Sequence, residues 1–158
     1  MKAIDYGKDY QEHLLEQYKL LVTMADNVSA RRAQTNSFYI TVLSALLAIL
    51  SLARENIVSE AQNIIFLVVS VLGMVLCIVW KININSYGQL NTGKFKVIHE
   101  MEAQLPFACY DREWEFLGAG QDSKKYLQLT KVEQYIPYLL AVPYLLLLVY
   151  SLYGLSAF

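Results

Sequence analysis

Three stretches of the chain carry no charged side chain, and each one is long enough to be a membrane span. They are residues 37–53, 61–80 and 136–155, which contain 17, 20 and 20 residues. A helix needs about 17–25 residues to cross a hydrocarbon core of about 30 Å. The first stretch meets this length at its lower limit, and Thr35 and Asn36 extend it with small polar side chains. The pattern therefore predicts three transmembrane helices.

The residues before the first span alternate between polar and apolar with the period of a helix. Apolar side chains recur at steps of three or four residues, with charged side chains between them. No Pro or Gly separates this stripe from the first span, which predicts one continuous helix from about Tyr10 to Ala53. A similar stripe follows Trp80 and stops before Pro106, so the second span is also expected to continue as a helix. The first stripe consists of Tyr10, Leu14, Tyr18, Leu21, Ala25 and Val28.

These elements predict an all-α fold with three transmembrane helices, two of them extended into a helical cytoplasmic region. The chain then divides into four segments. They are a cytoplasmic amphipathic helix (1–34), the first two transmembrane helices with a short external loop (35–80), a cytoplasmic helical region (81–135) and the third transmembrane helix (136–158).

Local signals organise the segment between the second and third spans. Gly118 and Gly120 predict a turn within residues 107–129, which we expect to hold short helical pieces. Thr130 is followed three residues later by Glu133, which is the capping pattern at the start of many helices. We therefore expect the third helix to start after Thr130. Glu133 then either caps the first amides of that helix or pairs with a basic residue of another helix.

The distribution of Lys and Arg predicts the orientation of the chain in the membrane. Five of the 13 lie in residues 1–36, seven lie in residues 81–135, one is Arg54, and none follows Leu155. Three spans place residues 1–36 and 81–135 on the same side, so the split is twelve to one. Because Lys and Arg are enriched in cytoplasmic loops, we expect a cytoplasmic N-terminus and a C-terminus on the outer side.

Composition argues against several classes of protein. Only 17% of the residues are charged and the net charge is −1, so neither a soluble enzyme nor a nucleic-acid binder is expected. His13 and His99 are the only histidines, and they lack the spacing of a zinc protease. Cys77 lies within a span and Cys109 outside one, which disfavours a disulfide. We therefore expect no catalytic residues, no metal and no cofactor.

The polar residues inside the spans allow two interpretations. The spans contain no Asp, Glu, Lys, Arg or His, which argues against a charge-coupled transporter. Small residues at helical spacing, Ser44 with Ala48 and Ser70 with Gly73, predict close contacts between helices. The alternative is a pore formed by several copies of the chain. Its candidate lining residues are Thr41, Ser44 and Ser51.

Several motifs occur together over residues 10–145. The pair Arg31-Arg32 precedes Asn36, Phe38 and Tyr39 at the entry to the first span. After Trp80 comes the run Tyr87-Gly88-Gln89-Leu90-Asn91-Thr92-Gly93-Lys94-Phe95, followed by Val97-Ile98-His99-Glu100-Met101-Glu102 and Leu105-Pro106. Tyr110, Glu113-Trp114, Tyr126, Thr130, Glu133 and Pro137 complete the set.

With these motifs the chain resembles the RipA family of octameric bacterial membrane proteins. The resemblance implies a small inner-membrane subunit that assembles as an octamer with a large helical cytoplasmic body, and it implies no established activity. A looser similarity links the chain to the membrane effector domains of bacterial conflict systems, which carry two spans. The third span departs from that second pattern.

The cytoplasmic residues independently favour self-association, because so short a region cannot bury all of its aromatic side chains alone. We expect a homo-oligomeric bacterial inner-membrane protein with a structural or scaffold role, and an oligomeric channel or pore is the alternative. An enzyme is not expected. The expected partners are further copies of the chain and membrane lipids, and no nucleic acid. Candidate interface or lipid-contact residues are Arg31, Arg32, Tyr87, Phe95, Glu102, Trp114 and Glu133.

Overall fold

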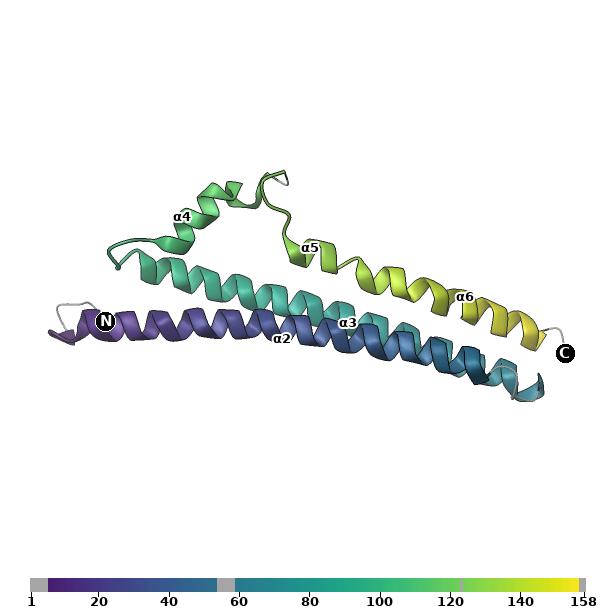
Figure 1. The fold of residues 1–158 in the computed structure, drawn as a ribbon. Helices are drawn as coiled ribbons and strands as arrows, with labels where there is room; N and C mark the ends of the chain where they lie inside the picture. Colours follow the sequence, from purple (N-terminus) through teal and green to yellow (C-terminus); the bar gives the residue numbers. More distant parts are fainter. Residues whose placement is uncertain (1–5, 54–58, 123, 157–158) are drawn as a thin grey trace. The chain divides into compact units, whose positions relative to one another are not determined.

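A computed structural model describes residues 6–53, 59–122 and 124–156 of the chain. It is 87% helical, and no β-strand occurs in the described residues, which confirms the all-α prediction. The elements in chain order are α2 (Tyr10–Ala53), α3 (Ser59–Glu102), α4 (Cys109–Phe116), the 3-10 helix η2 (Gly118–Gly120), α5 (Leu129–Glu133) and α6 (Ile136–Ser156) (Figure 1).

Three helical stretches are long and apolar enough to cross a membrane: Tyr10–Leu52, Ala61–Glu102 and Leu129–Ser156. The continuous first helix is confirmed, because α2 runs without a break from Tyr10 to Ala53. The second prediction is confirmed as well, since α3 continues beyond its apolar part and ends only at Glu102. The chain therefore has three candidate membrane spans, as the sequence predicts.

The start of the third helix differs from the sequence prediction. Thr130 lies inside the short helix α5, and Glu133 is the last residue of α5, so it is not the third residue of the membrane helix. Pro137 explains the break, because it has no N–H to donate to the carbonyl of Glu133 one turn earlier. Proline is tolerated in the first turn of a new helix, and α6 accordingly begins at Ile136.

The predicted glycine turn follows α4. Gly118 and Gly120 have φ angles of 74° and 71°, which glycine adopts without the steric cost that a Cβ would impose. Ala119 between them has a φ of 48°. The turn is thus a short 3-10 helix with left-handed backbone at both ends, and a glycine occupies each of these two positions.

The described chain falls into two compact units. Unit 1 comprises Met1–Arg32 and Ser86–Leu129, and therefore holds the N-terminal part of α2, the C-terminal part of α3, α4 and η2. Unit 2 comprises Ala33–Asn85 and Thr130–Phe158, with the remaining parts of α2 and α3, and with α6. Within each unit the segments of α2 and α3 run side by side (Figure 1).

The core of unit 2 lies where α2, α3 and α6 meet. Tyr144 of α6 is fully buried, and its hydroxyl donates a hydrogen bond of 2.6 Å to the carbonyl of Leu43 in α2. Its ring covers Gly73 of α3 so closely that a Cβ at that position would overlap the ring. The predicted close contact is confirmed for Gly73, and Ser70 is fully buried one turn before it. The core consists of Tyr39, Leu43, Cys77, Trp80, Ile84 and Tyr144.

Candidate functional site

A buried carboxylate organises unit 1. Glu102, the last residue of α3, is 1% exposed. It accepts three hydrogen bonds: 2.8 Å from the hydroxyl of Tyr18, 2.9 Å from the backbone N–H of Tyr110 and 3.0 Å from that of Asp111. A buried carboxylate is stable only when its lone pairs are matched by donors, and here the donors come from α2 and α4.

The two backbone donors explain why Glu102 stabilises α4. The first N–H groups of a helix have no partner within the helix, and Tyr110 and Asp111 are in the first turn of α4. Ala108, which precedes α4, makes no side-chain capping bond. Glu102 therefore caps α4 from the end of another helix, and its negative charge is favourable near the positive end of the helix dipole.

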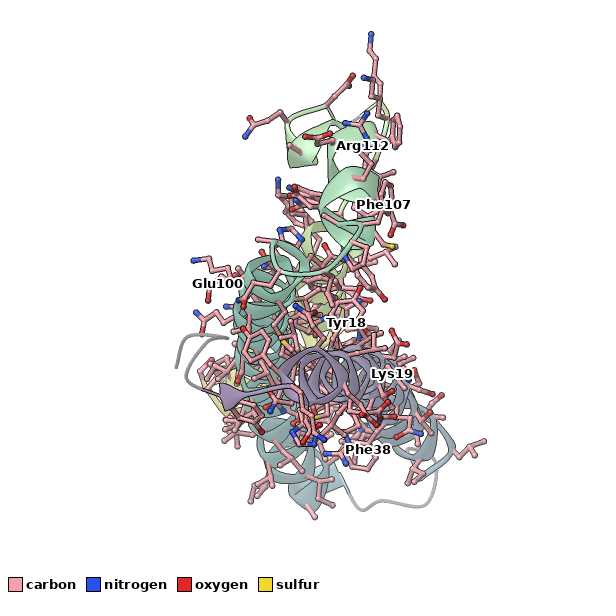
Figure 2. The ribbon with its side chains drawn as sticks, turned by 90° about the vertical axis from the view of Figure 1, so that its left-hand side faces the viewer. Tyr18, Lys19, Phe38, Glu100, Phe107 and Arg112 are labelled. Carbon is pink, nitrogen blue, oxygen red and sulfur yellow. The ribbon has the colours of Figure 1, made fainter. Side chains whose placement is uncertain are left out.

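The contrast with Glu100 shows how local this arrangement is. Glu100 is exposed and points outward from α3, as does Lys19 from α2, whereas Tyr18 faces the interior of unit 1 (Figure 2).

Burial, and next the hydrogen bond to Glu102, raise the pKa of Tyr18 well above its usual value. The pKa of Tyr110 is also raised, mainly by burial. Both phenols therefore stay protonated near neutral pH.

Further contacts surround Glu102. The ring of Phe95 meets that of Tyr110 edge to face, with centroids 5.6 Å apart. His99 Nδ1 lies 3.5 Å from a carboxylate oxygen of Asp111. The hydroxyl of Tyr10 donates to the side-chain amide of Gln104. The first two contacts join α4 to α3, and the third joins the residues after α3 to α2. Together with the hydrogen bonds of Glu102, they hold α4 and the segment after α3 against the two long helices.

A second polar cluster lies in unit 2, next to its aromatic core. The indole nitrogen of Trp80 donates a hydrogen bond of 2.8 Å to Oδ1 of Asn36, and the ring of Trp80 stacks on that of Tyr39 at 5.6 Å. The side-chain amide of Asn83 donates to the hydroxyl of Tyr39 at 3.0 Å. Because both of these hydrogen bonds join α2 to α3, the cluster favours one alignment of the two helices in unit 2.

Lys81, which follows Trp80 in α3, contacts the junction between α5 and α6. The ammonium Nζ of Lys81 donates a hydrogen bond of 3.3 Å to the carbonyl of Gln134. It also lies 5.0 Å from the centre of the Tyr138 ring, a cation–π distance. Lys81 thus ties α3 to the start of α6 at the end of an uncharged stretch.

One face of α2 within unit 2 has no large side chain. The residues along it are spaced three, four or seven apart, so they form a single stripe on the helix, and all of them are exposed in one chain. The opposite face of α2 holds the buried residues Tyr39, Leu43 and Leu50. We call this stripe the small-residue face of α2. It consists of Ser37, Thr41, Ser44, Ala48 and Ser51.

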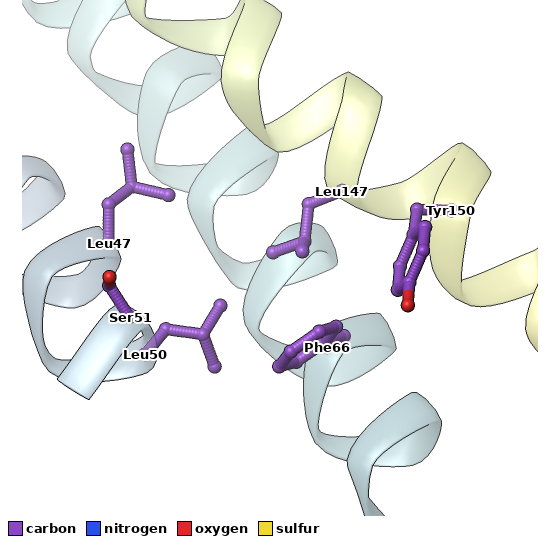
Figure 3. Close-up of a pocket in the computed structure, with 6 residues that line it drawn as sticks. All are labelled: Leu47, Leu50, Ser51, Phe66, Leu147 and Tyr150. Atoms are coloured by element: carbon purple, nitrogen blue, oxygen red, sulfur yellow. The ribbon is translucent and has the colours of Figure 1, made fainter. Parts of the chain in front are cut away.

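An open pocket of about 340 Å³ lies beside the end of this face (Figure 3). All three helices of unit 2 contribute to it, and its lining is mainly apolar. Ser51 supplies a hydroxyl and Tyr150 an exposed phenol at its edge. The pocket is lined by Leu47, Leu50 and Ser51 from α2, Phe66 from α3, and Leu147 and Tyr150 from α6.

The candidate interface residues from the sequence fall in several places. Phe95 and Glu102 converge, because both contact Tyr110. Trp114 is half-buried on α4 and packs beside Gly120, where an added Cβ would lie 2.9 Å from its ring. The remaining four candidates lie on α2 (Arg31 and Arg32), α3 (Tyr87) and α5 (Glu133). Arg31 is exposed, whereas Arg32, Tyr87 and Glu133 are half-buried.

Sequence reasoning did not single out Tyr18, Asn83 or Lys81 as site residues. Tyr18 was visible only as one member of an apolar stripe, because its partner Glu102 is 84 residues away. For Asn83 and Lys81 a signal existed: they are the first polar side chains after the uncharged residues 61–80. Polar groups at that position have to find partners on neighbouring helices or in lipid headgroups.

Residues 15–153 match the octameric membrane protein family (8xMP). No curated protein and no solved structure matches the chain.

Proposed function

The chain belongs to the octameric membrane protein family, and on that premise we propose that it is a homo-octameric scaffold of the bacterial inner membrane. The proposal assigns the protein no catalytic step. Its role is to hold eight copies of the helical residues outside the spans together at the membrane surface.

The small-residue face of α2 is the observation that carries the proposal. Small side chains on a membrane helix let a second helix approach closely, and their hydroxyls can bond across the contact. In one chain this face is exposed along five positions, from Ser37 to Ser51. Subunits that meet on this face would place α2 of one copy against a helix of its neighbour.

Charge supports the proposed orientation. The twelve-to-one split of Lys and Arg favours a cytoplasmic N-terminus and a periplasmic C-terminus. Unit 1 would then lie in the cytoplasm. Arg31 is exposed six residues before the first uncharged stretch, where a guanidinium can pair with lipid phosphate.

A pore is the second candidate function, and one observation favours it. Thr41, Ser44 and Ser51 all lie on the small-residue face, so in a ring of subunits their hydroxyls could line a water-filled centre. The same residues that suit close helix packing would then face water. The pore predicts that the oligomer lets small solutes cross the membrane, and the scaffold predicts that it does not.

The decisive experiment is dye release from liposomes that contain the purified protein. A scaffold predicts no release of a small trapped fluorophore above the level of protein-free liposomes. A pore predicts release that Ser44→Leu blocks and that Ile49→Phe, at an exposed large residue outside the small-residue face, leaves unchanged. Release with that pattern would reject the scaffold in favour of the pore.

A further inference from the structure

An apolar groove of about 520 Å³ runs along the junction of α5 and α6 in unit 2. Its walls are unusually exposed for apolar residues: Tyr135 is 72% exposed, Leu139 71% and Val142 50%. In water such a groove would be unfavourable, whereas next to acyl chains it costs little. The groove is lined by Val132, Tyr135, Ile136, Tyr138, Leu139 and Val142.

A cation stands at one side of this groove. The ammonium of Lys81 lies 5.0 Å from the ring centre of Tyr138, which lines the groove. The same ammonium donates a hydrogen bond of 3.3 Å to the carbonyl of Gln134. An ammonium has three N–H donors, and Gln134 uses one of them. Lys81 can therefore still donate to an anion beside the groove.

The chemistry of the two parts matches one kind of ligand. We propose that Lys81 and the α5–α6 groove bind an anionic phospholipid, with its phosphate on the Lys81 ammonium and one acyl chain along Leu139 and Val142. The structure supplies both halves of an amphiphile site, a cation and an adjoining apolar channel, within one unit. Basic residues beside such grooves select anionic headgroups.

The position of Lys81 in the sequence fits this ligand. It is the first charged residue after the uncharged stretch 61–80, so it reaches the level of the headgroups whichever side of the membrane it faces. Tyr135 and Tyr138 have the amphipathic rings that are enriched at this level. Lys131 and Glu133 on α5 carry opposite charges, so the preference for an anion rests on Lys81.

Native mass spectrometry of the purified oligomer tests the headgroup half of the site. Equal amounts of phosphatidylglycerol and phosphatidylcholine are added, and we expect more adducts of the anionic lipid. Lys81→Gln should lower phosphatidylglycerol binding about fivefold and phosphatidylcholine binding much less, because choline already neutralises the phosphate charge of that lipid. Lys81→Arg should retain the preference. Lys96→Gln, which removes an exposed lysine of unit 1, is the matched control and should resemble the wild type.

A second variant tests the groove. Leu139→Trp fills the groove at an exposed position, so the protein should still fold. The variant should bind less of both lipids and keep the copy number of the wild type. Three outcomes with these variants and lipids would overturn the proposal, and competition by glycerol phosphate would be a fourth. The three are equal binding of both lipids by the wild type, equal loss in Lys81→Gln and Lys96→Gln, and an altered copy number in Leu139→Trp, which would mean that a second copy covers the groove. Glycerol phosphate without acyl chains should not compete, and if it does, the site binds a free phosphate instead.

Discussion

The indole nitrogen of Trp80 donates a hydrogen bond of 2.8 Å to the side-chain oxygen of Asn36, and both residues are buried. The two side chains come from α3 and α2 and lie 44 residues apart in the sequence. A buried N–H without a partner costs about 1–3 kcal/mol, so this bond selects one alignment of the two helices over alternatives.

Asn36→Leu should therefore lower the free energy of unfolding by about 1–3 kcal/mol, because it leaves the Trp80 N–H without an acceptor. Thermal unfolding in detergent, followed by circular dichroism, measures the change. Gln34→Ala, two residues earlier and exposed, should leave the unfolding temperature unchanged. If Asn36→Leu unfolds at the wild-type temperature, the bond does not stabilise the fold.

Gly73→Ala should loosen the contact between α3 and α6. The new methyl group would overlap the ring of Tyr144, which is fully buried and cannot move away freely. Overpacking of this kind costs about 1–3 kcal/mol. Gly93→Ala is the matched control in the same helix, since nothing lies within 4 Å of its added Cβ. That change should be neutral or should raise stability by about 0.5–1 kcal/mol, and the opposite ranking of the two variants would contradict the packing described here.

Removal of the carboxylate of Glu102 should release α4. Glu102→Ala leaves the backbone N–H groups of Tyr110 and Asp111 without an acceptor, at a cost of about 3 kcal/mol. Hydrogen exchange at those two amides should accelerate strongly, while Glu100→Ala, two residues earlier and exposed, should not change it. Unchanged exchange in Glu102→Ala would show that α4 is held by other contacts.

The contact between Tyr18 and Glu102 should depend on pH in the alkaline range. Burial and the hydrogen bond to Glu102 raise the pKa of Tyr18 above the value of about 10 that the unfolded chain has. The stabilisation is then complete below that unfolded value and is lost as pH rises through the higher folded pKa. An ultraviolet titration of the wild type minus Tyr18→Phe should show one phenol that ionises late, and Glu102→Gln should shift it earlier. A phenol that ionises with the exposed tyrosines would refute the contact.

Substitution on the small-residue face of α2 should change the assembly. Ser44→Leu places a large side chain where we propose that a neighbouring helix packs, so the oligomer should dissociate or change in copy number. Ile49→Phe enlarges an exposed side chain outside this face and should leave the oligomer intact. Size-exclusion chromatography with light scattering compares the two, and equal behaviour would place the interface elsewhere.

The sequence predicted those features that depend on neighbouring residues. The bounds of α2 followed from a helical stripe without Pro or Gly, and the turn after α4 followed from Gly118 and Gly120. The break before α6 did not, because Thr130 and Glu133 match a capping pattern while the missing N–H of Pro137 decides the outcome. The capping pattern and the proline favour different starts for the helix, and the sequence alone does not show which of them prevails.

Long-range contacts were beyond the sequence for a different reason. Glu102 was among the candidate interface residues, but its donors on α2 and α4 depend on how the chain turns after α3. Lys81 entered the sequence argument only as a positive charge that sets orientation. Its partners Gln134 and Tyr138 are more than 50 residues away, and only the fold brings them together.

The mass of the particle extracted in detergent tests the central claim most directly. Native mass spectrometry should give eight times the mass of the 158-residue chain once bound lipid is removed. A particle of one or two chains, or a stable ring of another copy number, would contradict the octameric scaffold proposed here.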